Sequence, residues 1–499
     1  MATAVNSLVP PPASASLPKK LLINGEWVDS LSGKTFDSIA PSTGKVITQI
    51  AEGGPEDIDR AVTAARAAFE GPWSKFTPIQ REKVMHRFAD AVEARWPEMI
   101  ATDSLDMGFP IGFGPLLGDT YGSPELLRYF AGWPTKIAGE TLSNSAEGSF
   151  FTYTRREPAG VVGAITAWNG PRISGVHKIA PVLATGCTIV LKPSEVACLS
   201  SFVLGEIIQE LDLPPGVINI VSGLGPVAGA ALAEHPDVNR FNFTGSAATG
   251  QSIVTAAAGN LKQLTLELGG KSPDIIFADA DLDAAAQTGG MGIFGNSGQM
   301  CTAGSRVFVE RPAYDEFVQR LAKLGASLIV GNSLDPATMI GPIVSQRQID
   351  RVSGYIESGK SLGAEVVTGG ERITEGDLAD GFFLPPTVFA GVTDDMPIAK
   401  EEIFGPVVSV LPFDDLDEVV RRANATSYGL ASGVWTTDIR KATQVAHRLE
   451  AGVVWINTYN KFDANVPYGG HKMSGWGSEN GHNVIDEYLN VKTVWSNYG

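Results

Sequence analysis

Short apolar runs alternate with helix-like stretches through the middle of the chain. Five runs begin near positions 160, 187, 217, 240 and 263, and the segments 200–211 and 228–234 lie between some of them. The runs are rich in Val and Ile and barely alternate between apolar and polar residues, which is typical of strands covered on both faces. Their spacing of roughly 25–30 residues suits βαβ units of a parallel sheet.

A second α/β section begins near position 269, and two further segments fit neither section. The second section includes a strand-like run at 305–309, a helix-like stretch at 314–328 and another run at 452–456. The polar segments 141–156 and 488–495 are typical of half-exposed strands, whose open edges need a partner. We therefore expect the protein to associate with itself.

The N-terminal part differs in pattern from both sections. A hairpin is predicted at 21–28, where an Asn-Gly dipeptide separates apolar residues. Amphipathic helices are expected at 58–69 and 78–96. Residues 1–20 contain a Pro/Ala/Ser-rich stretch and lack the apolar core of a signal peptide, so we expect a flexible tail.

Composition and charge narrow the functional classes. The 499 residues carry 55 acidic and 38 basic side chains, a net charge of −17, which disfavours nucleic acid and anionic membranes as partners. No apolar run has the length of a membrane helix. Three cysteines are too few for a disulfide framework in such a chain, which indicates a reducing, cytoplasmic compartment. The six histidines show no metal-ligand spacing, so no metal site is expected.

Two residues are candidates for covalent and acid–base chemistry. Cys301 lies in a polar, glycine-rich segment, whereas Cys187 and Cys198 have the apolar neighbours of a buried thiol. A reactive and a structural role for Cys301 are equally open on this pattern. Glu267 ends an apolar strand, where burial would raise the pKa of its carboxyl into the range of a general base. The alternative for Glu267 is a salt bridge to Lys271.

Several strand ends are candidate sites for a dinucleotide. The segment 223–229 has glycines between a strand and a helix, but one residue too many for the G-x-G-x-x-G pattern. Gly245 and Ser246 precede a helix, whose N-terminus suits phosphate, although a helix cap explains Ser246 as well. The turn at 192–195 suits ribose hydroxyls, with a surface ion pair as the alternative. Asn169 suits either an oxyanion donor or a turn.

Together and in this order, the motifs resemble the aldehyde dehydrogenase superfamily. The resemblance runs from about position 21 to 495 and rests on the segments GVVGAITAWN, LKPSE, FTGS, LELGGKSP, GQMCTAGSR, EEIFGPV and PYGGHKMSG. It implies two Rossmann-like α/β domains with parallel sheets, one for the cofactor and one for catalysis, plus a small β arm for oligomerisation. The domain limits expected from it are 21–139 and 159–268 for NAD binding, 269–470 for catalysis, and 140–158 with 484–499 for the arm.

The resemblance also implies a reaction and its residues. Cys301 would attack the aldehyde, the Asn169 amide and the Cys301 N–H would hold the oxyanion, and Glu267 would activate the water that hydrolyses the thioester. NAD is the implied cofactor, and the carboxylate of Glu195 makes NADP less favourable. The residues implied to bind the cofactor are Ile165, Thr166, Trp168, Asn169, Lys192, Ser194, Glu195, Gly225, Phe243, Gly245, Ser246, Leu268, Gln348, Glu402 and Phe404.

Departures from the family pattern suggest which aldehyde is oxidised. Gly170 and Gly295 stand where relatives often have aromatic side chains, so we expect a wider tunnel that takes a bulky aldehyde, aromatic, terpenoid or long-chain, instead of acetaldehyde. The tunnel residues implied are Gly170, Ser174, His177, Gly295, Met300, Phe462 and Tyr468.

The resemblance leaves the assembly and two alternative functions open. Relatives are commonly dimers or tetramers, so we expect a homodimer or homotetramer. One alternative function is an acylating enzyme that uses coenzyme A, although such relatives generally lack the glutamate found here at Glu267. The other is a non-catalytic NAD-binding protein on the same fold.

Overall fold

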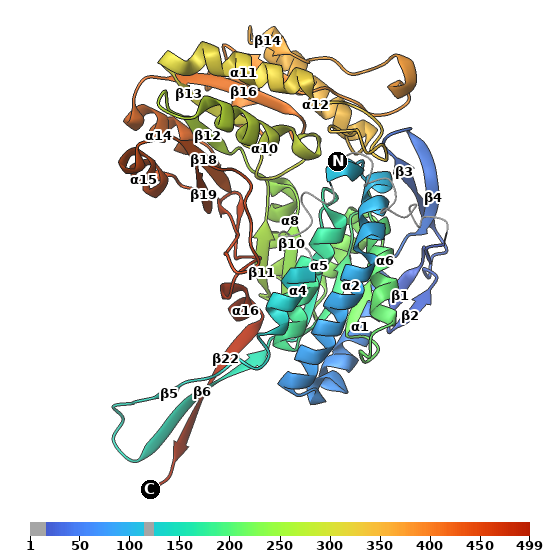
Figure 1. Ribbon diagram of the computed structural model, residues 1–499. Helices are drawn as coiled ribbons and strands as arrows, with labels where there is room; N and C mark the ends of the chain where they lie inside the picture. The colour runs from blue at the N-terminus through green and yellow to red at the C-terminus, as the bar shows by residue number, and fades with distance from the viewer. Residues whose placement is uncertain (1–15, 114–123) are drawn as a thin grey trace.

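The computed structural model describes residues 16–113 and 124–499, so most of the expected tail at 1–20 lies outside the described residues. Two large sheets with their helices form the body of the molecule, and a narrow arm extends from it (Figure 1). This arrangement confirms the expected fold class of two Rossmann-like α/β units with a β arm. The domain limits given above remain our proposal.

The first sheet has eight strands in the order β2-β1-β9-β8-β7-β10-β11-β21. Neighbours among β7 to β11 pair in parallel, whereas β1, β2 and β21 pair antiparallel at the two ends. The predicted hairpin and the five predicted strands are all present. The strands are β1 (Leu21–Ile23), β2 (Glu26–Val28), β7 (Val161–Ile165), β8 (Thr188–Lys192), β9 (Ile218–Ile220), β10 (Arg240–Thr244), β11 (Gln263–Glu267) and β21 (Gly475–Trp476).

Helices bury both faces of this sheet in two apolar clusters. One cluster contains side chains of α2, α4, α5 and α6, and the other contains side chains of α1, α7 and α8. Helix α2 is longer than predicted: it continues past Pro97, because Met99 and Ile100 of its last turns are buried in the first cluster. The helices are α1 (Pro55–Glu70), α2 (Pro78–Asp106), α4 (Pro124–Ala131), α5 (Pro171–Thr185), α6 (Leu199–Gln209), α7 (Ala230–Glu234) and α8 (Ala247–Ala257).

Two strands of the first sheet differ from the expected pattern. β7 and β8 are buried at every position and barely alternate, as predicted. In contrast, β10 reads RFNFT and β11 reads QLTLE, so polar and apolar residues alternate strictly along both. The prediction of non-alternating strands is therefore wrong for this pair, because one face of it packs against polar side chains described below.

The second sheet has seven strands in the order β14-β15-β16-β13-β12-β18-β19, and all but β14 pair in parallel. Its strands are β12 (Pro273–Ile276), β13 (Arg306–Glu310), β14 (Glu365–Thr368), β15 (Thr387–Ala390), β16 (Val407–Phe413), β18 (Ala431–Trp435) and β19 (Val453–Ile456). Its helices are α9 (Leu282–Ala284), α10 (Gly290–Phe294), α11 (Tyr314–Ser327), α12 (Gln346–Ser361), α13 (Pro397–Lys400), α14 (Leu416–Asn424) and α15 (Ile439–Arg448). Two short pairs complete the body, β3 (Thr35–Ala40) with β4 (Lys45–Ala51) and β17 (Tyr428–Gly429) with β20 (His471–Lys472).

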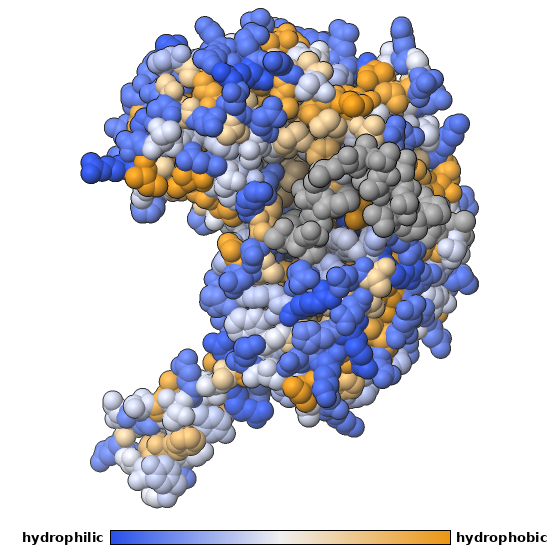
Figure 2. Space-filling model, in the orientation of Figure 1, coloured by the Kyte–Doolittle hydropathy of each residue, from blue (hydrophilic) through white to orange (hydrophobic). Residues whose placement is uncertain are grey.

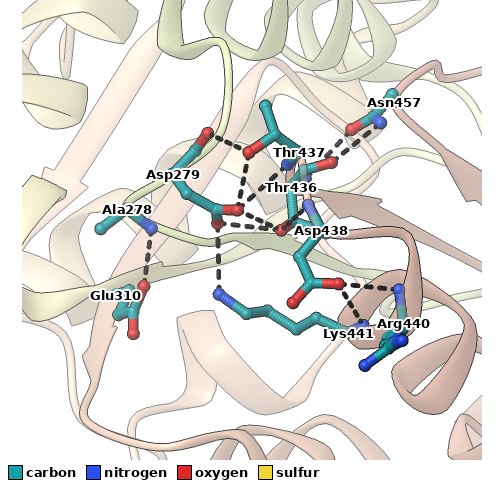
Figure 3. A network of polar contacts seen from close by, with 9 residues as sticks. All are labelled: Ala278, Asp279, Glu310, Thr436, Thr437, Asp438, Arg440, Lys441 and Asn457. Carbon is teal, nitrogen blue, oxygen red and sulfur yellow. Dashed lines mark hydrogen bonds and ion pairs between the residues drawn. The ribbon is translucent and has the colours of Figure 1, made fainter.

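A polar network joins the loops that follow β12, β18 and β19 (Figure 3). The carboxylate of Asp279 accepts hydrogen bonds from the hydroxyls of Thr436 and Thr437 and pairs with Lys441 of α15. Although partial burial opposes ionisation, these donors lower the pKa of Asp279 to about 2. Asn457 exchanges two further hydrogen bonds with the backbone of Thr436. The network therefore fixes the carboxyl edge of the second sheet.

The arm is a three-stranded antiparallel sheet, and it fits the two polar segments predicted to be strands. Its order is β22-β6-β5, with β5 (Thr141–Leu142), β6 (Phe150–Pro158) and β22 (Leu489–Asn497), and α16 (Asn483–Glu487) leads into β22. The arm is paler in Figure 2 than the strongly hydrophilic surface around it. Its large exposed side chains include Phe151, Val491 and Trp495. No helix of the described residues combines the length and apolarity needed to cross a membrane.

Arg306 of β13 tests how strongly the second sheet depends on one buried cation. Arg306 is 3% exposed. Its guanidinium donates to the carbonyl of Lys271 and to the carbonyls of Arg422 and Ala423, which lie in the last turn of α14. We expect Arg306→Met to lower the free energy of unfolding by about 2–4 kcal/mol, because buried carbonyls lose a charged donor. The control Arg311→Met breaks the exposed pair with Asp414 and should change it by less than about 0.5 kcal/mol. Equal losses in urea unfolding of the two variants would contradict this account.

Candidate active site

The loop that carries Cys301 joins α10 to β13 and is held in a strained conformation. Asn296 and Ser297 adopt φ values of 50° and 56°, which side chains rarely tolerate. Hydrogen bonds compensate: the Ser297 hydroxyl donates to the Gly341 carbonyl at 2.8 Å, and Gln299 accepts from the Val344 N–H at 2.9 Å. The loop is therefore polar in sequence but buried and rigidly connected.

The Cys301 thiol is half-buried and lies 3.3 Å from the hydroxyl of Tyr468. Burial raises the pKa of the thiol to about 12, although the hydrogen bond from Tyr468 opposes the shift. Cys187 and Cys198 are fully buried, as their apolar neighbours predicted. Cys301 is thus the accessible thiol of the three, and it carries its proton until a reaction removes it.

Glu267 ends β11, and its side chain is 4% exposed with no hydrogen bond to either carboxylate oxygen. Burial raises the pKa of this carboxyl well above its usual range, and the neighbouring Glu479 raises it further. The alternative salt bridge to Lys271 is not formed, because the amine of Lys271 has no hydrogen-bond partner either. Burial lowers the pKa of Lys271 to about 7.

A buried ion pair lies beside Glu267, and the sequence analysis missed it. Lys178 of α5 contacts the Glu479 carboxylate and the Thr244 hydroxyl, and both charged side chains are at most 8% exposed. Although burial opposes it, Lys178 lowers the pKa of Glu479 to about 2. Glu479 is therefore ionised and pairs with the ammonium group of Lys178, whereas Glu267 is left as the protonated carboxyl. The polar residues that alternate with apolar ones in β10 and β11 were the signal in the sequence that could have indicated a buried polar cluster here.

Asn169 connects the start of α5 to the Cys301 loop. Its side-chain amide donates to the carbonyl of Gln299 at 3.0 Å, and Asn296 donates back to the Asn169 carbonyl at 3.0 Å. Gln299 precedes Cys301 by two residues, so the amide reaches the segment where the thiol lies. This position suits a donor to an oxyanion formed at Cys301.

Two strand ends of the first sheet offer groups for a dinucleotide. Ser246 caps α8 by accepting from the Thr249 N–H at 3.3 Å, and Gly245 precedes it at the helix start, where phosphate binding stays a prediction. Lys192 and Glu195 form an ion pair of 2.7 Å, and Glu195 also accepts from the Gly225 N–H at 3.1 Å. Burial notwithstanding, Lys192 lowers the pKa of the Glu195 carboxyl, which keeps it an acceptor for hydroxyls.

A second group of predicted cofactor residues gathers where the two sheets meet. Glu402 accepts from the Gly270 N–H at 3.0 Å, and burial raises the pKa of its carboxyl to about 7. A side chain at Gly269 would overlap this carboxylate. The ring of Phe404 meets Trp168 edge-on at 5.1 Å, and Gln348 donates to the Phe404 carbonyl at 3.0 Å.

The remaining predicted cofactor residues lie at the carboxyl ends of β7, β8, β10 and β11. One observation supports a ligand there: the Thr166 hydroxyl is buried and lacks a hydrogen-bond partner. An unsatisfied buried hydroxyl, a helix N-terminus and a held carboxylate together fit a pyrophosphate with its ribose. The residues are Ile165, Thr166, Ser194, Phe243 and Leu268, all of them buried.

The predicted tunnel residues differ in what surrounds them. A Cβ added at Gly295 would meet no atom within 4 Å, and one at Gly170 would meet only Ile173 at 3.9 Å. Phe462 and Tyr468 pack edge-on at 5.6 Å. His177 is buried, with Nδ1 3.6 Å from the Glu479 carboxylate, which ties it to the ion pair described above. Ser174 and Met300 are half-buried.

Known proteins with similar sequences and folds share one description. Residues 27–494 match the model of the aldehyde dehydrogenase family. The chain is 49% identical to an aldehyde dehydrogenase of Enchytraeus buchholzi over 95% of each protein, and 47% identical to the mitochondrial aldehyde dehydrogenase of Homo sapiens over 95% of this chain and 91% of that protein. It also resembles the NAD+ complex of aldehyde dehydrogenase from Bacillus cereus, with 47% identity, a TM-score of 0.92 and 96% of each chain covered.

The contact between Cys301 and Tyr468 can be tested by alkylation. The Tyr468 hydroxyl stabilises the thiolate, so we expect Tyr468→Phe to slow the reaction of Cys301 with iodoacetamide about tenfold at neutral pH. Peptide mass spectrometry measures the rate at each cysteine, and the buried Cys187 and Cys198 serve as internal controls. Unchanged or faster labelling of Cys301 in the variant would refute this role of the hydroxyl.

Proposed function

The chain belongs to the aldehyde dehydrogenase family, whose activity is the oxidation of aldehydes with NAD(P), and we propose that Cys301 and Glu267 carry out that reaction in it. One observation carries the proposal. The half-buried thiol of Cys301 and the buried carboxyl of Glu267 meet the same short segment: the thiol lies 3.3 Å from the Tyr468 hydroxyl, and a Cβ at the next residue, Gly469, would lie 3.4 Å from a carboxylate oxygen of Glu267. This combination serves a covalent intermediate that is later hydrolysed.

The first half of the proposed mechanism is attack by the Cys301 sulfur on the aldehyde carbonyl. Burial raises the pKa of the thiol to about 12, so it is protonated at rest and loses its proton to a water molecule as the C–S bond forms. The amide of Asn169 and the backbone N–H of Cys301 hold the resulting oxyanion of the thiohemiacetal. NAD, when bound, would supply the acceptor for the hydride that the thiohemiacetal carbon loses on becoming a thioester.

The second half is hydrolysis of the thioester. Glu267 removes a proton from water as the water oxygen attacks the acyl carbon. The C–S bond then breaks, the acid is released, and the proton held by Glu267 passes to the Cys301 sulfur, which restores the thiol. A buried carboxylate is a strong base once it is ionised, because burial favours its protonated form. The ion pair of Lys178 and Glu479 lies beside Glu267, and the positive charge of Lys178 opposes the rise of its pKa and so favours its ionised form.

The cofactor would be bound by the strand-end groups described above. Lys192 and Glu195 would hold the adenosine ribose, Ser246 the pyrophosphate, and Glu402 with Phe404 the nicotinamide ribose. The Glu195 carboxylate would repel a 2′-phosphate, so we propose a preference for NAD over NADP. This preference rests on the Gly225 N–H and Lys192, which hold the carboxylate in place.

The substrate is proposed to be a bulky aldehyde, either aromatic, terpenoid or long-chain. Gly170 and Gly295 both face space that a larger side chain would fill, and Phe462 with Tyr468 provides an aromatic wall. We propose that the substrate occupies the open space beside these two glycines. A kcat/KM for acetaldehyde above that for benzaldehyde would rule it out.

We also propose that the enzyme is a homodimer or homotetramer in a reducing, cytoplasmic compartment. The edge of β22 and the exposed side chains of Phe151, Val491 and Trp495 offer apolar surface and unpaired backbone groups to a second copy. All three cysteines are free, which suits a reducing compartment. The net charge of −17 supports the absence of nucleic-acid and membrane partners.

Glu267→Gln separates the two halves of the mechanism. We expect a burst of NADH with close to one equivalent per site, followed by steady-state turnover reduced about 10²–10⁴-fold, because Gln cannot accept a proton from water. Stopped-flow absorbance measures both phases, and Cys301→Ala should lose the burst as well. Turnover within twofold of the wild-type rate in Glu267→Gln would exclude the proposed base, and a full burst in Cys301→Ala would support the non-catalytic alternative for this thiol.

Gly295→Phe tests the wide tunnel. The φ of −53° at Gly295 suits any residue, so the phenyl group should occupy the open space without backbone strain. We expect kcat/KM for benzaldehyde to fall at least about tenfold while that for propionaldehyde changes less than about threefold. The control Gly354→Phe adds the same group at an exposed position of α12 that is also free of neighbours. Parallel losses for both aldehydes in Gly295→Phe would contradict the proposal.

A further inference from the structure

The hydroxyl of Tyr468 contacts the sulfur of Cys301 in a place sheltered from solvent. The two atoms lie 3.3 Å apart, and Tyr468 is 4% exposed. The mechanism above provides donors for the oxyanion, from Asn169 and from the backbone of Cys301, but none for the sulfur. Negative charge nevertheless develops on the sulfur when it attacks the aldehyde and again when it leaves the acyl carbon. A donor to the sulfur would therefore act in both halves of the reaction.

The surroundings of Cys301 otherwise disfavour a negatively charged sulfur. Burial raises the pKa of the thiol, and the carboxyls of Glu267, Glu402 and Glu479 raise it further. The hydrogen bond with Tyr468 acts in the opposite direction and lowers it. A poorly stabilised thiolate is also a poor leaving group, because the electron pair of the broken C–S bond stays on the sulfur. The Tyr468 hydroxyl thus offsets an effect that the rest of the site imposes.

Packing and a backbone hydrogen bond hold Tyr468 in position. Its ring meets Phe462 edge-on at 5.6 Å, and Phe462 meets Trp455 of β19 edge-on at 5.5 Å. The Tyr468 carbonyl accepts from the Glu479 N–H at 2.9 Å, which ties its backbone to the residue of the buried ion pair. The hydroxyl is therefore in place before a substrate arrives, as a preorganised donor requires.

The residue after Tyr468 brings the same segment to the base of the second half-reaction. A Cβ at Gly469 would lie 3.4 Å from a carboxylate oxygen of Glu267 and 2.4 Å from the carbonyl oxygen of Gly477. The missing side chain lets the segment pass between these groups. Two consecutive residues therefore adjoin the nucleophile and the base. The Tyr468 hydroxyl is thus at hand when water activated by Glu267 displaces the sulfur.

We propose that Tyr468 is a further catalytic residue, whose hydroxyl donates a hydrogen bond to the Cys301 sulfur during its attack and its departure. The proposal rests on the proposed roles of Cys301 and Glu267. In the attack, the C–S bond forms and an electron pair of the C=O bond moves to oxygen. In the departure, the C–S bond breaks, its electron pair stays on the sulfur, and the sulfur takes the proton held by Glu267. Tyr468 keeps its own proton throughout.

Tyr468→Phe in the full-length enzyme removes the hydroxyl and keeps the packed ring. We expect the rate of the NADH burst and the steady-state rate each to fall about 10–100-fold, because the charged sulfur loses a hydrogen bond in both halves. The burst amplitude should stay close to one equivalent per site, since the two rates fall together. Glu267→Gln differs from this variant because it slows only the steady state. Stopped-flow absorbance measures the amplitude and both rates.

Replacement of Tyr468 by 3,5-difluorotyrosine distinguishes a hydrogen-bond donor from a merely structural ring. Fluorine makes the phenol more acidic, so the hydroxyl donates more strongly while it is protonated and cannot donate once it is ionised. Relative to the wild-type rate, we expect the burst rate to be equal or higher at low pH. It should then fall as the pH rises through the pKa of the phenol, because a phenolate repels the thiolate. Absorbance of the phenolate reports that pKa.

Tyr314→Phe is the matched control, because its hydroxyl donates to the Val410 carbonyl at 3.2 Å in the second sheet. It should leave both rates and their pH dependence unchanged. Rates within twofold of wild type in Tyr468→Phe would overturn the proposal. A difluorotyrosine enzyme whose burst rate follows the wild-type pH profile would overturn it too, even if Tyr468→Phe does not fold. A burst rate that rises as the phenol ionises would make the oxygen an acceptor of the thiol proton and exclude the donor.

Failure of this role and failure of the proposed function give different results. If only the role of Tyr468 is wrong, Cys301→Ala still loses the burst, and Glu267→Gln still loses hydrolysis after a full burst. If the proposed function is wrong, Cys301→Ala keeps the burst or Glu267→Gln turns over normally.

Discussion

Burial of ionisable groups at the carboxyl end of β11 is the constraint on which the rest of the site depends. Removal from water raises the pKa values of Glu267 and Cys301, so neither group is charged at rest. Lys178 and Glu479 can stay charged in the same buried surroundings only because they form an ion pair with each other. The site thus separates one fixed pair of charges from two groups that become charged only during the reaction, when a dry environment makes each interaction strongest.

The Cys301 loop shows how the fold holds a reactive group away from ordinary backbone geometry. Left-handed conformations at Asn296 and Ser297 each cost on the order of 1–3 kcal/mol. The hydrogen bonds of Ser297 to Gly341 and of Gln299 to Val344 offset this cost from a neighbouring segment. The thiol is therefore positioned by contacts that are distant in sequence, and its reactivity is a property of the assembled sheets.

Most of the fold could be predicted from the sequence because strand and helix signals are local. Five of the eight strands of the first sheet followed from apolar runs. Helix α2 was predicted to end before Pro97, since burial of the turns beyond it is a tertiary effect. Cys301 stood out by its polar neighbours. Lys178 and Glu479 did not, because they are 301 residues apart and meet only in three dimensions. Strict alternation in β10 and β11 was the one local trace of their cluster.

Two kinds of glycine serve opposite purposes around this site. At Gly269 and Gly298 a side chain would overlap Glu402 or the backbone of Gly405, so these positions permit close approach of chain segments. At Gly170 and Gly295 a side chain would meet almost nothing. The first kind is required by the fold and should resist any substitution. The second kind removes volume without disturbing the core, so the size of the substrate space can change while the Cys301 loop and Glu267 stay in place.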